Sequence, residues 1–174
     1  MEEKPQKSKE SCDTRRFKEF KEFKEKYETL RKKYDLPDFK FMNENFEIEN
    51  VACEETELLA KKIRKQMMEK ISLSFHSLEM LKNPQNAPLF IFSMIKSFSP
   101  SDKDNLELLY NKFAGFEIEA FGLETYYDEK KEIEFIKKVC KEWKEVCSDF
   151  NKIYESMKSG NKPDSKKHQK SYFG

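Results

Sequence analysis

The chain has 174 residues, of which 39% are charged, and its 34 Lys and Arg residues almost balance its 33 Asp and Glu residues. This length is typical of one domain. The net charge of +1 excludes a protein that binds polyanions over its whole surface, so an electrostatic function would need local segregation of charge. Because Gly and β-branched residues are scarce, we predict an all-α fold: a bundle of about five helices with coiled-coil-like seams.

The predicted bundle domain spans residues 15–159, between a disordered lead at 1–14 and a flexible basic tail at 160–174. No apolar stretch approaches the roughly 20 residues of a membrane-spanning helix, and no secretory signal is visible at the start. The cysteines form no C-x-x-C pair, which favours reduced thiols. We therefore predict a cytoplasmic protein that does not contact a membrane.

The first helix is predicted to end at Leu36-Pro37, because a proline disfavours helix at the residue before it. Asp38 can cap a short second helix, and residues 47–50 are expected to be an extended connector. The apolar seam of the first helix consists of Phe20, Phe23, Tyr27, Leu30 and Tyr34, and that of the short helix of Phe39, Met42 and Phe46.

A second long helix is predicted from about residue 54 to 82, with a stripe of Leu59, Ile63, Met67, Ile71, Phe75, Leu78 and Leu81. Pro88 suits the first turn of a short apolar helix that runs to about Phe98. Because this helix is apolar nearly all round, we expect the other helices to bury it.

Ser99-Pro100 is predicted to start the next helix, with Ser99 as its cap. A capping-box-like pair, Thr125 and Asp128, is predicted to start the last helix, which Gly160 closes. The apolar stripe of the helix that starts at Ser99-Pro100 consists of Leu106, Leu109, Phe113, Phe116 and Ala120. The seam of the last helix consists of Ile136, Cys140, Trp143, Cys147, Phe150, Tyr154 and Met157.

Catalytic patterns are scarce. His76 has no second histidine in the predicted bundle, and glycine-rich phosphate loops are absent. Residues 117–134 carry a local charge of −5, but acids concentrate in the first turn of a helix for dipole reasons alone, so we expect a solvated acidic face. The sequence therefore predicts no enzyme, no cofactor and no metal site.

Basic residues are concentrated in three segments, 15–34, 61–70 and 158–174. Such segments can pair with acidic neighbours within the bundle, or bind a phosphate backbone of nucleic acid or the ribosome. The candidate nucleic-acid contacts are Arg15, Arg16, Arg31, Lys32, Lys33, Lys61, Lys62, Arg64, Lys65, Lys166, Lys167 and Lys170.

The tail carries two adjacent aromatic residues, Tyr172 and Phe173. They form a frayed end, fold back onto the bundle, or serve as a docking peptide, since exposed aromatic residues favour binding pockets. We predict a non-enzymatic interaction or adaptor protein that docks a protein partner through a helix face or this pair. Nucleic-acid or ribosome association is the alternative, and the seam of the first helix could also join two copies of the chain.

Several strings of the chain resemble a set of small all-helical proteins from archaea. They are Tyr34-Asp-Leu-Pro-Asp-Phe39, Glu57-Leu-Leu59, Asn86-Ala-Pro-Leu-Phe90, Glu132-Ile-Glu-Phe-Ile-Lys-Lys138 and the closing Tyr-Phe-Gly. The resemblance implies an archaeal setting and a helical fold, and it implies no known activity.

Overall fold

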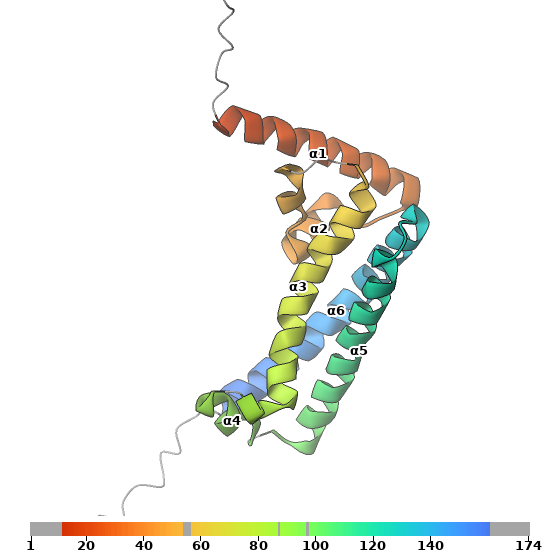
Figure 1. Cartoon of the computed structure of the whole chain (residues 1–174). Helices are drawn as coiled ribbons and strands as arrows, with labels where there is room; N and C mark the ends of the chain where they lie inside the picture. Colours follow the sequence, from red (N-terminus) through yellow and green to blue (C-terminus); the bar gives the residue numbers. More distant parts are fainter. Residues whose placement is uncertain (1–11, 54–56, 87, 97, 161–174) are drawn as a thin grey trace, which may run out of the picture. The chain divides into compact units, whose positions relative to one another are not determined.

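The computed structural model describes residues 12–53, 57–86, 88–96 and 98–160. These residues form six α-helices and two short 3-10 helices, and no strand occurs among them (Figure 1). The all-α prediction is therefore confirmed. The elements are α1 (Cys12–Tyr34), α2 (Phe39–Phe46), η1 (Ile48–Cys53), α3 (Leu59–Lys82), η2 (Pro84–Asn86), α4 (Leu89–Ile95), α5 (Pro100–Glu124) and α6 (Glu129–Gly160).

The chain forms two compact units. Unit 1 combines the described residues up to Lys70 with Glu119–Cys140, and unit 2 combines Ile71–Ile118 with the described residues from Lys141 onward. The long helices α3, α5 and α6 each contribute residues to both units. Each unit buries apolar side chains, such as Phe23 in unit 1 and Phe113 in unit 2.

In unit 1, α1 packs onto α2 through aromatic rings. The ring of Phe39 meets those of Phe20, Phe23 and Tyr27 edge-on, with centroids 5.9, 6.0 and 5.7 Å away. The Tyr27 hydroxyl donates a hydrogen bond of 2.7 Å to the carbonyl of Pro37. The predicted seam of the first helix is therefore used within the chain.

The ends of α1 and α2 follow the predicted signals. Asp35 adopts a left-handed conformation (φ 53°), and the N–H of Leu36 donates to the carbonyl of Arg31 at 3.2 Å, as in a Schellman motif. The carboxylate of Asp38 accepts a 2.7 Å hydrogen bond from the N–H of Phe41 and so caps α2.

The segment after α2 differs from the prediction. Residues 48–53 form the 3-10 helix η1 instead of an extended connector. Glu47 is left-handed (φ 55°), and the side chain of Asn43 accepts a hydrogen bond from the N–H of Glu49 at 3.0 Å. These contacts form a turn directly after α2. They satisfy backbone hydrogen-bonding groups that, in an extended segment, would need a neighbouring strand as partner.

In unit 2, α5 begins as predicted. The hydroxyl of Ser99 accepts from the N–H of Asp102, and the carboxylate of Asp102 accepts in turn from the N–H of Ser99, which completes a capping box. The ring of Phe113 is fully buried and meets Phe150 of α6 edge-on at 5.5 Å. The whole predicted stripe of α5 is buried.

The last helix departs from the prediction in two ways. It begins at Glu129, capped by the carboxylate of Asp128, whereas the hydroxyl of Thr125 donates to a carbonyl near the end of α5. Its buried face includes Val139, Val146 and Ile153 beside predicted residues such as Ile136 and Trp143, while Cys147 and Tyr154 are exposed. A 3.5-residue repeat drifts by about 20° per heptad around a straight α-helix, which moves such positions out of the core.

Candidate functional site

An ion-pair cluster in unit 1 buries two charged side chains. Arg64 of α3 is 2% exposed and Glu132 of α6 is 0% exposed. The Nε of Arg64 donates to one carboxylate oxygen of Glu132 at 2.5 Å, and its NH2 group donates to Glu124 of α5 at 2.6 Å. The other oxygen of Glu132 is buried without a hydrogen-bond partner. The cluster therefore ties three helices together within the unit.

Glu124 lies at the solvent edge of this cluster. Its second carboxylate oxygen is 3.2 Å from the amine of Lys61 and 3.6 Å from that of Lys65. The hydrogen bond from Arg64 is the largest cause that lowers the pKa of Glu124 from 4.5 to about 2, with help from Lys61. Glu124 is therefore ionised at neutral pH and stays ionised in moderately acidic solution.

This pKa shift predicts a pH dependence of stability. A carboxylate whose pKa is lower in the folded state stabilises the fold above its unfolded pKa and loses that contribution as the pH falls through the folded pKa. In Glu124→Gln, we expect the free energy of unfolding to fall less steeply between pH 4.5 and about 2 than in the unchanged protein. Denaturant unfolding at several pH values measures these slopes.

The exposed Glu134 on the same unit provides the control. Glu134→Gln should keep the steep slope of the unchanged protein. Equal slopes in Glu124→Gln and the unchanged protein would show that the Arg64 contact does not couple protonation to folding.

Most of the predicted nucleic-acid contacts that the structure describes have acidic partners. Arg31 pairs with Glu28 at 3.1 Å and Lys33 with Glu129 at 2.8 Å. The predicted contacts Lys61, Arg64 and Lys65 all pair with Glu124. Arg64 is a correction to the prediction, because its guanidinium is buried and engaged and is not presented to a phosphate backbone. These pairs reduce the positive charge that the predicted surface offers.

The other predicted nucleic-acid contacts differ in how far the structure describes their side chains. Lys32 is exposed, and Lys62 is half-buried. Arg15 and Arg16 belong to α1, but their side chains are not described. Outside the described residues lie Lys166, Lys167, Lys170, Tyr172 and Phe173.

The acidic segment 117–134 is also more structured than predicted. Glu132 is buried, Glu129 accepts hydrogen bonds from Lys33 and Tyr34, and Glu119 pairs with Lys138. The prediction of a solvated acidic face is therefore wrong for Glu132, which Arg64 pairs in the core, whereas Glu119 and Glu129 stay partly exposed beside their lysine partners.

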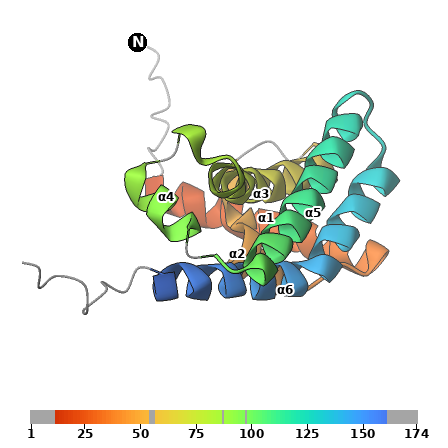
Figure 2. The ribbon, with the colours of Figure 1, turned by 90° about the horizontal axis from the view of Figure 1, so that it is seen from below.

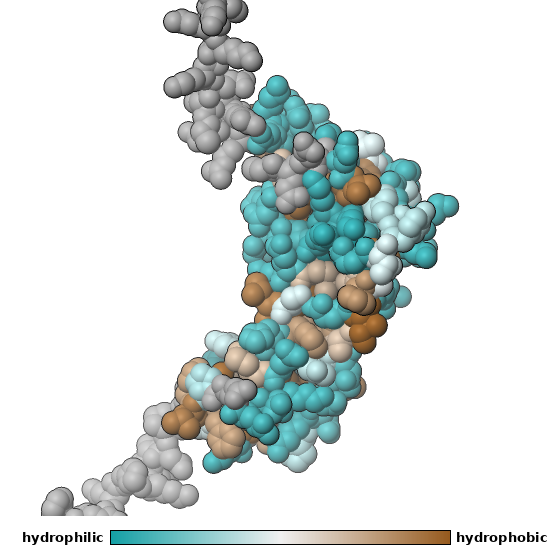
Figure 3. Space-filling model, viewed as in Figure 1, coloured by the Kyte–Doolittle hydropathy of each residue, from teal (hydrophilic) through white to brown (hydrophobic). Residues whose placement is uncertain are grey.

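The clearest correction concerns α4 in unit 2. Leu89 is 88% exposed, Phe90 62% and Phe92 42%, and only Met94 of this helix is buried. We call Leu89, Phe90 and Phe92 the α4 face. Figure 3 shows brown and tan atoms gathered over α4 at the lower left of the view. The helix is apolar as predicted, but the prediction that the other helices bury it is wrong.

A sequence signal for the α4 face exists in the charge pattern. Between residues 83 and 99 the only charged residue is Lys96, in a chain of which 39% is charged. The amine of Lys96 lies over the ring of Phe92, 4.8 Å from its centroid. An exposed apolar surface with so little charge nearby is a feature of binding surfaces.

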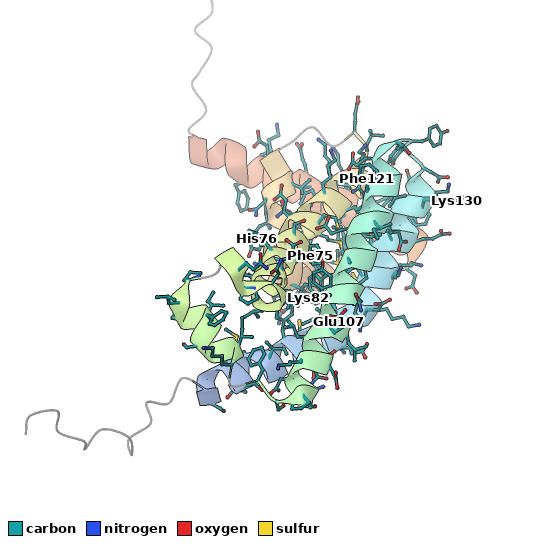
Figure 4. The ribbon with its side chains drawn as sticks, turned by 60° about the horizontal axis from the view of Figure 1, so that its bottom comes forward. Phe75, His76, Lys82, Glu107, Phe121 and Lys130 are labelled. Atoms are coloured by element: carbon teal, nitrogen blue, oxygen red, sulfur yellow. The ribbon has the colours of Figure 1, made fainter. Side chains whose placement is uncertain are left out.

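A second feature of unit 2 is an open groove of about 500 Å³ between α3 and α5. Its lining includes His76, Glu79, Lys82 and Tyr110. Lys82 is held by Glu107 at 2.8 Å and lies over the Tyr110 ring, 3.9 Å from its centroid; Figure 4 shows Lys82 and Glu107 together between the two helices. The only histidine of the groove is a surface residue, 3.8 Å from Glu79.

Two cysteine thiols of α6 lie in surroundings that disfavour the thiolate. Burial raises the pKa of the Cys140 thiol to about 12 and also raises that of Cys147, which keeps both thiols protonated at neutral pH. Among the described residues, no three His, Cys, Asp or Glu side chains are placed to hold a metal ion.

No helix in the described ranges has the length and apolar character needed to cross a membrane. Comparison of the chain with protein-family models, with curated proteins and with solved structures finds no match.

Proposed function

We propose that this chain is a non-enzymatic interaction protein, and that the α4 face docks an apolar groove of a protein partner. The exposure of Leu89, Phe90 and Phe92 on one short helix carries this proposal. Large apolar side chains gain free energy when a partner removes them from water, about 25 cal/mol for each Å² of apolar surface. Leu89 and Phe92 are three residues apart, a spacing of the anchors in helix-in-groove recognition.

The charge around the α4 face indicates the chemistry of the partner. Lys96 is the only charged residue between 83 and 99, so the contact would depend on apolar burial and little on ion pairs. Binding should therefore persist at high salt, in contrast to phosphate binding, which weakens steeply as counterions are restored. This difference separates the proposal from the nucleic-acid alternative.

The test compares proteins captured by immobilised chains from nuclease-treated native extract. The double variant Leu89→Ser/Phe90→Ser should lose a protein that the unchanged chain captures, by about tenfold or more, because it removes two exposed anchors. The matched control is Leu108→Ser, which changes an exposed leucine (66%) on α5 of the same unit. Both variants should keep the helical circular-dichroism signal.

Two results would contradict the proposal. Capture of the same proteins by the double variant and the unchanged chain would show that the α4 face does not dock a partner. Loss of all captured material after nuclease treatment would favour the nucleic-acid alternative.

A further inference from the structure

We propose that Tyr172 and Phe173 of the tail dock onto the α4 face of the same molecule. The two features complement each other: an exposed apolar helix face on unit 2, and an aromatic pair on a polar, lysine-bearing segment that follows α6. The contact itself is independent of the proposed function. Its consequence, competition between the tail and the partner for one surface, rests on that function.

The structure fixes the end of α6 close to α4. The hydroxyl of Ser156 donates a 2.6 Å hydrogen bond to the carboxylate of Asp102, which also caps the start of α5 with Ser99. A turn closed by the N–H of Phe98 and the carbonyl of Ile95 joins this start to α4. Figures 1 and 2 both place the end of α6 on the same side of unit 2 as α4.

The length of the tail suits this separation. Tyr172 follows Gly160, the last residue of α6, by twelve residues. Twelve residues without regular structure would have a root-mean-square span of about 20 Å, and fully extended they would reach about 40 Å. The seven residues from Ile95 to Asp102 span at most about 25 Å of chain. The α4 face is therefore within the extended reach of the aromatic pair.

The tether also favours this occupant over a second copy of the chain. A short flexible linker gives an effective concentration of about 1 mM, roughly a thousandfold above a protein solution at micromolar concentration. A contact between two aromatic side chains and three exposed apolar ones is small, so it benefits most from being intramolecular. Docking in the same molecule is therefore the favoured arrangement.

Hydrogen exchange of the α4 amides tests the contact. A helix of seven residues with one buried side chain is expected to open locally, so a docked tail should slow its exchange. In Tyr172→Ala/Phe173→Ala, made in the full chain, we expect residues 89–96 to exchange at least about threefold faster than in the unchanged protein. The control Lys166→Ala/Lys167→Ala keeps the aromatic pair and should leave the exchange unchanged.

The measurement is repeated over a tenfold range of protein concentration. Faster exchange in the aromatic variant at every concentration supports docking within one molecule. Equal exchange in the variant and the unchanged chain overturns the proposal, and so does protection that rises with concentration, which would assign the contact to a second copy. Since no partner is present, failure here leaves the capture experiment on the α4 face as a separate test of the proposed function.

Discussion

Replacing Arg64 with methionine is expected to lower the free energy of unfolding by about 3–5 kcal/mol, because it leaves a buried carboxylate without its ion-pair partner. Glu132 is 0% exposed, and Arg64 donates to one of its two oxygens while the other has no hydrogen-bond partner. In Arg64→Met, neither oxygen keeps a donor from the cluster. Urea unfolding followed by far-UV circular dichroism measures the loss.

Two further variants show whether the loss comes from the buried charge. Lys65→Met changes a cation near the same cluster that is 55% exposed, and it should cost at most about 1 kcal/mol. The double variant Arg64→Met/Glu132→Leu removes both buried charges and should recover most of the stability lost in Arg64→Met. A loss in Arg64→Met no larger than that in Lys65→Met would contradict this account of unit 1.

Shortening Phe113 to alanine is expected to cost about 3–5 kcal/mol in the core of unit 2, because the removed ring leaves a cavity that its neighbours fill only partly. Phe113 is fully buried and contacts Phe116 and Phe150 edge-on, with centroids 6.1 and 5.5 Å away. Its ring is also stacked on that of Phe75, at 6.5 Å. The same unfolding measurement applies.

Leu108 on the same helix provides the matched control. It is exposed, so Leu108→Ala should change the free energy of unfolding by no more than about 0.5 kcal/mol. Similar losses in Phe113→Ala and Leu108→Ala would mean that α5 does not bury the predicted stripe.

The helices themselves could be predicted well from the sequence, because their signals are local. Asp38 and Ser99 cap α2 and α5 as expected, and the stripe of α5 is buried in full. Leu36 and Pro37 lie where α1 ends, because a left-handed residue and a proline oppose a further helical turn. These features depend only on residues a few positions apart.

Burial of particular side chains also depends on residues far away in the chain, and the predictions failed for Arg64, for α4 and for part of the α6 seam. Arg64 and Glu132 are 68 residues apart, so no local pattern joins them into a buried pair. The composition of α4 shows that the helix is apolar but does not show which neighbours cover it, and its exposure follows from the tertiary arrangement of unit 2. In α6, a heptad repeat drifts around a straight helix, so some of the buried residues differ from those predicted from the repeat.

The α4 face was not among the docking surfaces predicted from the sequence. An apolar helix face was expected to dock a partner, but the face was placed on a seam or on the tail and not on α4. The near absence of charge between residues 83 and 99 was the available signal, and it fits a buried helix as well as an exposed binding surface.

The most direct test of the α4 face is capture of the partner at low and high salt, after nuclease treatment, by the unchanged chain and by Leu89→Ser/Phe90→Ser. We expect the unchanged chain to retain its partner at both salt concentrations and the double variant to lose it at both. Equal capture by the two chains at low salt, abolished for both at high salt, would contradict apolar docking by α4 and assign the binding to the basic surface of the protein.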